Sequence, residues 1–374
     1  MSMVEWKKLG DICEVFAGGD LPNNYIKESK PFSEYQYPIF SNGIEEKSLY
    51  GFSDSFRVDK PAITISARGT IGYHTIRKSK FTPIVRLITL IPKNQQLVNL
   101  SYLNEALYTT NIDGTKGGIP QLTVPVVSKI KLPIPSLFEQ NRIVTILDTF
   151  TSSIENLKQQ IAQRRKQYEH YRDQLLDLEG KEKEDIHSWG EFCEMIKGNG
   201  VQKADFVDEG KGCIHYGQIY THYGPFTYST NRYVSEEVFE KAKKASKGDI
   251  IMTDTSENVE DICKSVAYLG EEDIAVSNHA LIIKHKQNPK FLSYSTQTNS
   301  FFLQKRKVVV GVKVSGIKPA HLAQIKIYLP NIDEQNRIVS ILDTFEASIE
   351  NLEAQLKERE KQYEYYRNKL LTFE

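Results

Sequence analysis

The sequence predicts an α+β protein in which two globular domains of mixed α/β structure alternate with two long helices, as a pseudo-two-fold tandem repeat. Two observations support this prediction. Residues 139–179 recur without a gap as residues 334–374, and 27 of the 41 aligned positions are identical. The stretches that precede the two copies contain short strand-like runs between turns rich in Gly and Asn, which is typical of compact domains built on sheets.

Both copies have the spacing of coiled-coil helices. Their apolar and aromatic positions alternate in steps of four and three residues over about five heptads, with no Pro or Gly between them. A helix of 41 residues is ~60 Å long, and its natural partner is the other copy. The alternative is that each helix packs separately on its own domain.

The predicted seam also contains one arginine in each copy, Arg164 and Arg359, which weakens the packing but fixes the register of the pair. The apolar seam positions are Ile143, Leu147, Phe150, Ile154, Leu157 and Ile161 in the first copy, and Ile338, Leu342, Phe345, Ile349, Leu352 and Leu356 in the second. The pattern continues beyond the arginines through Tyr168, Tyr171, Leu175 and Leu178, and through Tyr363, Tyr366, Leu370 and Phe373.

The remaining sequence divides into two domains and a linker. We expect a first domain at 1–135, a central helix at 136–180, a charged linker at 181–188, a second domain at 189–330 and a C-terminal helix at 331–374. Ser136 is the expected N-cap of the central helix. The second domain begins and ends like the first, at Trp189 and at 325–330. The two domains therefore resemble each other at their beginnings and ends, but little in the residues between.

Composition excludes several classes of protein. The chain has 374 residues, 40% hydrophobic and 26% charged, which is too long for one core and typical of a soluble globular protein. Its first residues lack a signal-peptide pattern, and no apolar run reaches membrane-spanning length. The four cysteines, Cys13, Cys193, Cys213 and Cys263, show no zinc-ligand spacing, so we expect reduced thiols in a cytoplasmic protein.

The charge of the chain is distributed unevenly, although the formal net charge is zero. Residues 1–135 and 186–330 carry +4 and +2, whereas residues 136–185 and 331–374 carry −2 and −4. This imbalance permits contact with DNA without arguing strongly for it. The duplication gives the stronger indication, because duplex DNA is the commonest partner with two-fold symmetry of its own.

The two long helices begin with a shared signature, Pro135-Ser-Leu-Phe-Glu-Gln-Asn-Arg-Ile-Val144 and Pro330-Asn-Ile-Asp-Glu-Gln-Asn-Arg-Ile-Val339. With the tandem layout, the turn at 68–72 and the segment at 312–317, it resembles the specificity subunits of Type I restriction-modification systems over the whole chain. The resemblance implies two target recognition domains that each read one half of a bipartite DNA target. It also implies that the helices pair as an antiparallel coiled coil, which acts as a spacer and docks two methyltransferase subunits. One departure is Pro120, which stands where the second domain has Ser315.

Only fragments of catalytic motifs are present. Residues 288–291 and 16–19 partly match the catalytic clamp and the cofactor loop of adenine methyltransferases, and we interpret both as ordinary turns. We therefore expect no catalytic residue, metal ligand or cofactor in this chain. The resemblance implies that S-adenosylmethionine, ATP and Mg are bound by partner subunits, and it leaves the presence of restriction subunits open. Two alternatives remain: a DNA adenine methyltransferase that acts alone, and a coiled-coil scaffold whose globular domains bind proteins.

Base-reading side chains are expected in loops between strands, where Arg suits guanine and phosphate, Asn and Gln suit adenine, and Thr suits the thymine methyl. A turn or surface role is the alternative for each of them. The candidates in the first domain are Ser41, Asn42, Ser66, Arg68, Thr70, Tyr73, Lys116 and Gln121. Those in the second are Tyr216, Gln218, Tyr220, Thr253, Thr255, Ser256, Asn278, His279, Lys305, Arg306, Lys313 and Ser315. Tyr168, Tyr171, Tyr363 and Tyr366 are expected to contact the methyltransferase subunits.

Overall fold

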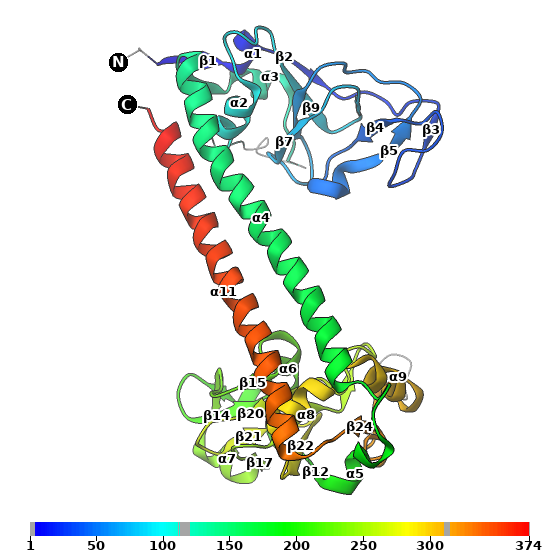
Figure 1. The fold of residues 1–374 in the computed structure, drawn as a ribbon. Coiled ribbons are helices and arrows are strands. Elements are labelled where there is room, and N and C mark those ends of the chain that lie inside the picture. Colours follow the sequence, from blue (N-terminus) through cyan, green and yellow to red (C-terminus); the bar gives the residue numbers. More distant parts are fainter. Residues whose placement is uncertain (1–3, 111, 113–119, 310–314, 374) are drawn as a thin grey trace. The chain divides into compact units, whose positions relative to one another are not determined.

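A computed structural model describes residues 4–110, 112, 120–309 and 315–373. The chain forms two compact units, one made of residues 1–158 and 354–374 and the other of residues 159–353. Each unit therefore contains one globular domain and one half of each long helix (Figure 1).

The first unit contains two four-stranded sheets. One has the order β2-β9-β6-β7 and the other β3-β5-β4-β8. The strands of the first sheet are β2 (Cys13–Ala17), β9 (Leu87–Pro92), β6 (Ala62–Ser66) and β7 (His74–Arg77), and those of the second are β3 (Tyr25–Ile26), β5 (Leu49–Ser53), β4 (Tyr37–Phe40) and β8 (Thr82–Pro83). β1 (Glu5–Lys8) pairs antiparallel with β10 (Lys131–Ile134). The helices of this domain are α1 (Leu9–Ile12), α2 (Leu100–Leu107) and α3 (Val124–Lys129), with the 3-10 turn η1 (Glu45–Ser48).

The second unit repeats this plan with longer sheets. Its sheets have the orders β12-β22-β18-β20-β15 and β13-β16-β14-β21-β17. The first is built from β12 (Cys193–Lys197), β22 (Ala280–His285), β18 (Ile250–Thr253), β20 (Ser265–Tyr268) and β15 (Phe226–Thr227). The second is built from β13 (Phe206–Val207), β16 (Arg232–Val234), β14 (Lys211–Ile214), β21 (Ile274–Val276) and β17 (Lys244–Ala245).

Short elements close the second domain. Two strand pairs join β11 (Ile186–Ser188) to β24 (Lys326–Tyr328) and β19 (Thr255–Ser256) to β23 (Ser315–Gly316). The helices are α5 (Trp189–Phe192), α6 (Tyr216–Thr221), α7 (Glu236–Lys241), α8 (Pro289–Ser295), α9 (Asn299–Val308) and α10 (Pro319–Leu322), with 3-10 turns η2 (Lys183–Asp185) and η3 (Lys203–Asp205). No helix among the described residues combines the length and the apolar character needed to cross a bilayer.

The two long helices are α4 (Leu137–Leu176) and α11 (Ile332–Leu371), each of 40 residues. In the first unit Phe150 stacks on Tyr366, with ring centroids 5.2 Å apart, and Lys158 pairs with Glu360. In the second unit Arg165 pairs with Glu353, and Tyr171 packs on Phe345 at 5.4 Å. Within each unit the residue numbers rise along α4 as they fall along α11, so the predicted antiparallel pairing is confirmed.

The same helices also enter the cores of the domains. Ile143 and Leu147 of α4 are buried with Leu9, Ile63 and other side chains of the first domain. In the second unit Ile338 and Leu342 of α11 are buried with Trp189, Phe291 and their neighbours. The N-terminal turns of each helix thus pack on a domain, the middle turns pack on the other helix, and the last turns pack on a domain again, as Leu176 of α4 and Leu371 of α11 show. Packing of a helix on a domain and packing of the two helices on each other therefore occur together. Both are possible because the apolar stripe of each helix is longer than either contact.

A buried glutamine ties the start of each long helix to its domain. Gln140 accepts a hydrogen bond from the Asn99 backbone N–H at 2.8 Å, and its amide nitrogen donates to Leu97 O at 2.9 Å and Pro135 O at 2.8 Å. Gln335 is placed in the same way in the second unit. It accepts from the Asn288 backbone N–H at 3.0 Å and donates to Pro330 O at 2.7 Å. The shared Gln of the helix-start signature is therefore a structural clamp.

The asparagines beside these clamps are helix caps. The Asn99 side chain accepts hydrogen bonds from the first turn of α2, and the Asn288 side chain accepts from Phe291 N at the start of α8. Residues 288–291 are therefore the N-cap and first turn of a helix, which explains why they only partly match a methyltransferase clamp.

Candidate nucleic-acid interface

In the first unit, the candidate surface lies where β6 ends. The Ala67 backbone N–H, directly after β6, donates to Arg86 O at 2.8 Å, and Ala67 O accepts from Leu122 N at 2.8 Å. These two hydrogen bonds bring three distant segments together at one strand end. Leu122 follows Gln121, which is exposed.

The turn after β6 is held against the loop that follows β4. The Asn42 side-chain amide donates to Arg68 O at 2.9 Å, and the Tyr73 hydroxyl accepts from Glu45 N at 3.0 Å. Gly69 and Gly72 have φ of +77° and +82°, a conformation in which glycine carries no steric penalty. The structure thus groups seven of the candidates, Ser41, Asn42, Ser66, Arg68, Thr70, Tyr73 and Gln121, whereas Lys116 lies outside the described residues.

The two backbone hydrogen bonds of Ala67 form a frame at the end of β6, and the second unit has the same frame at the end of β18. The Asp254 backbone N–H donates to His279 O at 3.1 Å, and Asp254 O accepts from Ile317 N at 2.9 Å. Asp254 therefore corresponds to Ala67, His279 to Arg86 and Ile317 to Leu122. The frame repeats, and the side chains on it differ.

An aromatic cavity of about 460 Å³ opens beside this frame, lined by Tyr216, Tyr220, Thr255, Ser256, Glu257, Asn258, Asp261 and His279. His279 Nδ1 lies 3.2 Å from the Thr255 hydroxyl, which donates to Asp254 Oδ1 at 2.7 Å. Lys197 Nζ lies 3.2 Å from the other Asp254 oxygen. Five of the predicted residues thus line one cavity, and Ser315 joins them through its backbone pairing with Ser256 in β23 and β19.

Several predicted residues serve the fold rather than an open surface. Thr253 is fully buried and donates to Asp261 O at 3.0 Å. Gln218 closes the N-terminal capping box of α6, and the Asn278 side chain accepts from Gly200 N at 3.1 Å. Ser66 is buried at the end of β6. Of the remaining candidates, Arg306 is exposed on α9, and Lys313 lies outside the described residues.

Lys305 differs most from its expected role as an exposed DNA contact. It is only 4% exposed, and its ammonium donates to Glu260 O at 2.8 Å and Ile262 O at 2.6 Å. Burial lowers the pKa of this ammonium. Lys305 points inward because it follows the buried Phe301 by four positions on α9, and such residues share a helix face.

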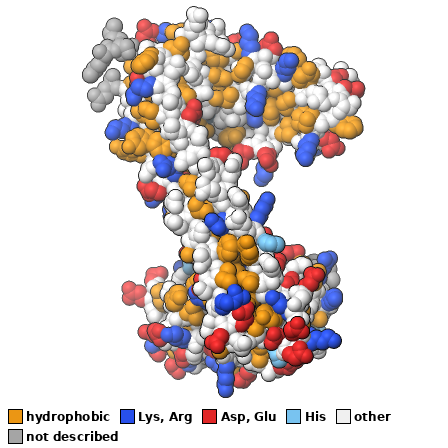
Figure 2. Space-filling model, viewed as in Figure 1, with side chains coloured by type: hydrophobic (Ala, Val, Ile, Leu, Met, Phe, Trp, Pro, Cys, Tyr) orange, Lys and Arg blue, Asp and Glu red, His pale blue; other side chains and the backbone are white. Residues whose placement is uncertain are grey.

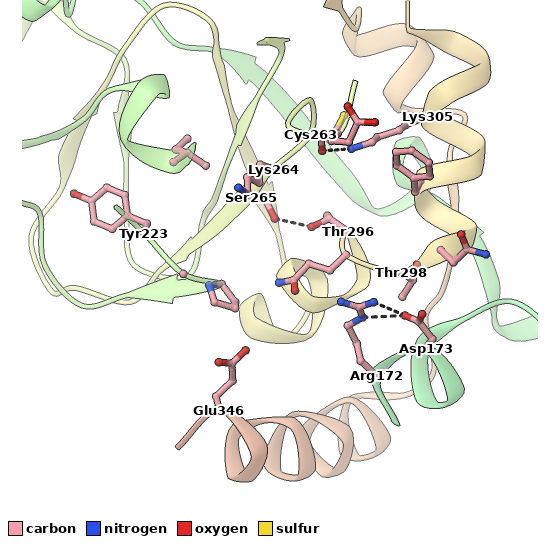
Figure 3. A pocket seen from close by; sticks show the side chains of 17 residues that line it. Arg172, Asp173, Tyr223, Cys263, Lys264, Ser265, Thr296, Thr298, Lys305 and Glu346 are labelled. Atoms are coloured by element: carbon pink, nitrogen blue, oxygen red, sulfur yellow. Dashed lines mark hydrogen bonds and ion pairs between the residues drawn. The ribbon is translucent and has the colours of Figure 1, made fainter. Parts of the chain in front are cut away.

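Lys305 lines a second cavity of the same unit, of about 650 Å³ (Figure 3). Arg172 and Asp173 point toward one another there, 2.7 Å apart, and Ser265 and Thr296 are hydrogen-bonded at 2.9 Å. Burial also raises the pKa of Glu346, which lines it. This cavity shares no lining residue with the one at His279.

Arg86 is a surface residue that sequence reasoning missed. It stands directly before β9 as His279 stands directly before β22, and its side chain is exposed. An alignment of the two domains on β9 and β22 would have paired Arg86 with His279. The face in Figure 2 shows basic and acidic side chains interspersed over each unit. Single exposed residues such as Arg86 therefore indicate a DNA-contacting surface better than the overall charge of a unit does.

Each half of the helix pair carries a groove beside the stacked aromatic rings. The groove in the first unit is lined by Ile146, Phe150, Glu358, Arg359, Lys361, Gln362, Tyr365 and Tyr366. The groove in the second is lined by Arg164, Gln167, Tyr171, Gln174, Leu175, Ile341 and Phe345. Five residue pairs correspond at the repeat offset of 195, namely Ile146 with Ile341, Phe150 with Phe345, Arg164 with Arg359, Gln167 with Gln362 and Tyr171 with Tyr366.

The four tyrosines expected to meet a partner fall into two classes. Tyr171 and Tyr366 line the grooves and are 44% and 40% exposed. Tyr168 is buried beside Tyr294, and the Tyr363 hydroxyl donates to Glu105 at 2.7 Å. Tyr168 of α4 therefore packs on the second domain and Tyr363 of α11 on the first, which corrects the expectation that all four are available to a partner.

Comparison with known proteins covers nearly the whole chain. The family model described as Type I restriction modification DNA specificity domain matches residues 1–164 and 182–360. A protein of Mycoplasma pneumoniae named as a type I specificity subunit is 35% identical over 174 residues, which are 45% of this chain and 47% of that protein. The chain thus matches about half the length of that relative. A type I restriction enzyme specificity subunit of Escherichia coli is 27% identical over 99% of this chain and 94% of its own length.

Solved structures show a similar fold. The crystal structure of a Type I restriction-modification system S subunit from M. genitalium has a TM-score of 0.59 and 16% identity, covering 100% of this chain and 97% of that one. A chain from a type I system studied for complex assembly and conformational transition has a TM-score of 0.58 and 15% identity, covering 98% and 96%.

Proposed function

The chain belongs to the Type I restriction modification DNA specificity family, and we propose that it is the non-catalytic specificity subunit of a Type I restriction-modification complex. In this role residues 1–135 and 189–330 are target recognition domains, and each reads one half of a bipartite sequence in double-stranded DNA. The helices at 136–180 and 331–374 set the spacing of the two domains.

The observation that carries this proposal is the repeated frame at the ends of β6 and β18. The same two hydrogen bonds position Ala67 and Asp254, while the side chains around them differ between the domains. Direct reading of bases depends on the hydrogen-bonding pattern of individual side chains. A common frame with different side chains is therefore suited to placing two unlike readers on two unlike half-sites.

The paired grooves support the second part of the proposal, the docking of two methyltransferase subunits. Each groove exposes a tyrosine, Tyr171 or Tyr366, beside a half-buried phenylalanine and an arginine of the seam. Aromatic and arginine side chains are enriched at the centres of protein interfaces. Two grooves with matching residues suit two copies of one partner. Such partners would bind S-adenosylmethionine, and restriction subunits would bring ATP and Mg.

Methylation mapping tests the specificity role. A methylation-free host would express the cognate methyltransferase subunit with and without this chain, and methylated positions would be sequenced. We expect a split motif of two short halves around a fixed gap, present only with the chain. Absence of chain-dependent methylation from a complex shown to co-purify would contradict the proposal and favour the scaffold alternative. Binding of S-adenosylmethionine by the isolated chain would favour the methyltransferase alternative.

Docking is tested separately by charge substitutions in the grooves. Tyr171→Glu and Tyr366→Glu should each weaken co-purification of the methyltransferase subunit, and the double variant should abolish it. Tyr228→Glu is a matched control, because Tyr228 is also exposed and lies in neither groove. Assembly that survives the double variant would show that the partner binds elsewhere.

A further inference from the structure

Arg86 and His279 occupy the same backbone position in the two domains. Each directly precedes an inner strand of its sheet, β9 or β22, and its carbonyl accepts the N–H of the first residue after the neighbouring strand. The strand registers agree, because the last residues of β6 and β18 face the first residues of β9 and β22. The equivalence therefore rests on hydrogen bonds and on register in both domains.

Both residues also adopt a left-handed backbone conformation, which is uncommon for residues other than glycine. Arg86 has φ of +75° and His279 has φ of +65°. Residues other than glycine adopt this left-handed region uncommonly, because Cβ approaches the backbone carbonyl closely, and arginine does so less often than histidine, asparagine or aspartate. Glycine would fit either position without this strain. The two domains thus bear the same local strain at the same place.

Contacts within the described residues do not explain why these side chains are there. The exposed guanidinium of Arg86 has no hydrogen-bond or ion-pair partner in the part of the chain that the structure describes. His279 makes one hydrogen bond, to the Thr255 hydroxyl at 3.2 Å, and its carboxylate neighbour Asp254 is 3.9 Å away. For Arg86, backbone strain without a compensating internal contact points to a functional role for the side chain. His279 stands at the corresponding place with its ring against Tyr216, at 5.3 Å between centroids, and beside the Thr255 hydroxyl.

From this geometry we infer that Arg86 and His279 are corresponding base-reading residues, one in each recognition domain. The inference rests on the proposed function, which it deepens by naming a specificity determinant in each half. A free guanidinium on a fixed backbone suits bidentate contact with O6 and N7 of a guanine. Arg86 therefore selects guanine at one position of the first half-site.

The hydrogen bonds around His279 determine what it selects. The Thr255 hydroxyl gives its only hydrogen to Asp254 Oδ1, so it accepts a hydrogen bond from Nδ1–H of His279. In the neutral form of the ring, Nε2 is then the acceptor. An acceptor in the major groove pairs with the exocyclic amino group of cytosine or adenine. His279 selects such an amino group at one position of the second half-site.

The test compares methylation motifs of variants in the assembled complex. Arg86→Ala should lower the preference for guanine at one position of one half by about tenfold or more, with the other half and the spacing unchanged. His279→Ala should relax one position in the opposite half only. Arg86→Lys keeps the charge but loses the planar fork, so it should relax the same position as Arg86→Ala while keeping affinity.

Glycine variants separate reading from folding. Arg86→Gly and His279→Gly remove the strain, so their melting temperatures should be no lower than that of the wild type, yet their motifs should relax. Lys80→Gly is the matched control, because Lys80 has φ of +64°, is exposed and lies outside the frame. Its motif should be unchanged.

Two failures are distinguishable. A wild-type complex that directs no methylation would overturn the proposed function itself. A wild-type complex that methylates a split motif, with Arg86→Ala and His279→Ala leaving that motif unchanged, would overturn only the assignment of these two residues.

Discussion

Replacing Gln140 with leucine should destabilise the first unit strongly, although leucine is similar in size. The side chain is fully buried and makes three hydrogen bonds, with the N–H of Asn99 and the carbonyls of Leu97 and Pro135. All three partners are backbone groups of elements that cannot turn toward water without disrupting the helix start. Leucine would therefore leave one donor and two acceptors without partners.

The magnitude follows from these three groups. Each buried polar group left without a partner costs about 1–3 kcal/mol, and the apolar surface of leucine recovers about 1–2 kcal/mol. We expect a net loss of about 4 kcal/mol in the free energy of opening the first unit. Gln335→Leu should cost less, about 2 kcal/mol, because one of its three partners is the side chain of Gln287, which can turn to solvent.

Hydrogen exchange of peptides from α2 and α8 would measure the two effects separately, since a chain of two units is not expected to unfold in one step. Gln174→Leu is the control on the same helix as Gln140, because Gln174 is exposed and its replacement should change stability by less than about 0.5 kcal/mol. If protection in α2 falls no further for Gln140→Leu than for Gln174→Leu, the clamp interpretation is refuted.

Three further predictions concern stability and spacing. Burial, aided by Arg367, lowers the pKa of His74 below its ordinary value of 6.5. The unfolded chain therefore takes up a proton that the folded chain does not as pH falls below 6.5, and stability is lost. His74→Gln should destabilise the first unit less at pH 5.5 than at pH 7.5 in urea unfolding, and an equal effect at both pH values would contradict this. Tyr102→Phe should cost about 1 kcal/mol in the same assay, because the buried hydroxyl donates to Pro133 O at 2.7 Å. Inserting one heptad into both long helices should move the methylated half-sites apart by about 3 base pairs, from ~10 Å of added helix at 3.4 Å per pair. Half-sites that keep their spacing would show that the helices do not set it.

The long helices were predictable because their signal is local and repeated. A 3.5-residue period depends only on neighbouring turns of one helix, and the second copy supplied the partner. The heptads did not reveal that Ile143 and Leu147 pack on a domain while Phe150 packs on the other helix. That division depends on where the domain ends, and the clamp at Gln140 fixes that point through contacts with residues about 40 positions away in sequence.

The candidate surface was predicted less completely, because strand register decides which side of a strand each residue faces. The sequence pointed to the loops around Arg68 and His279, but it gave no sign that Thr253, at the end of β18, is buried. For Lys305 a signal existed, since its position four residues after Phe301 puts both on one face of α9. The left-handed conformation of Arg86 had no signal in composition or charge.

The two domains differ where length can vary and agree where hydrogen bonds fix the backbone. Gln140 and Gln335 are 195 residues apart, as are Leu122 and Ile317, whereas Arg86 and His279 are 193 apart and Ser66 and Thr253 are 187 apart. The segments between the strand end and Arg86 or His279, and from there to Leu122 or Ile317, therefore differ in length between the domains, and loops absorb such differences at little energetic cost. Because the frame at each strand end closes through backbone groups, it does not depend on which side chains stand there. A side chain on this frame can change the base that is read without moving the strands that position it.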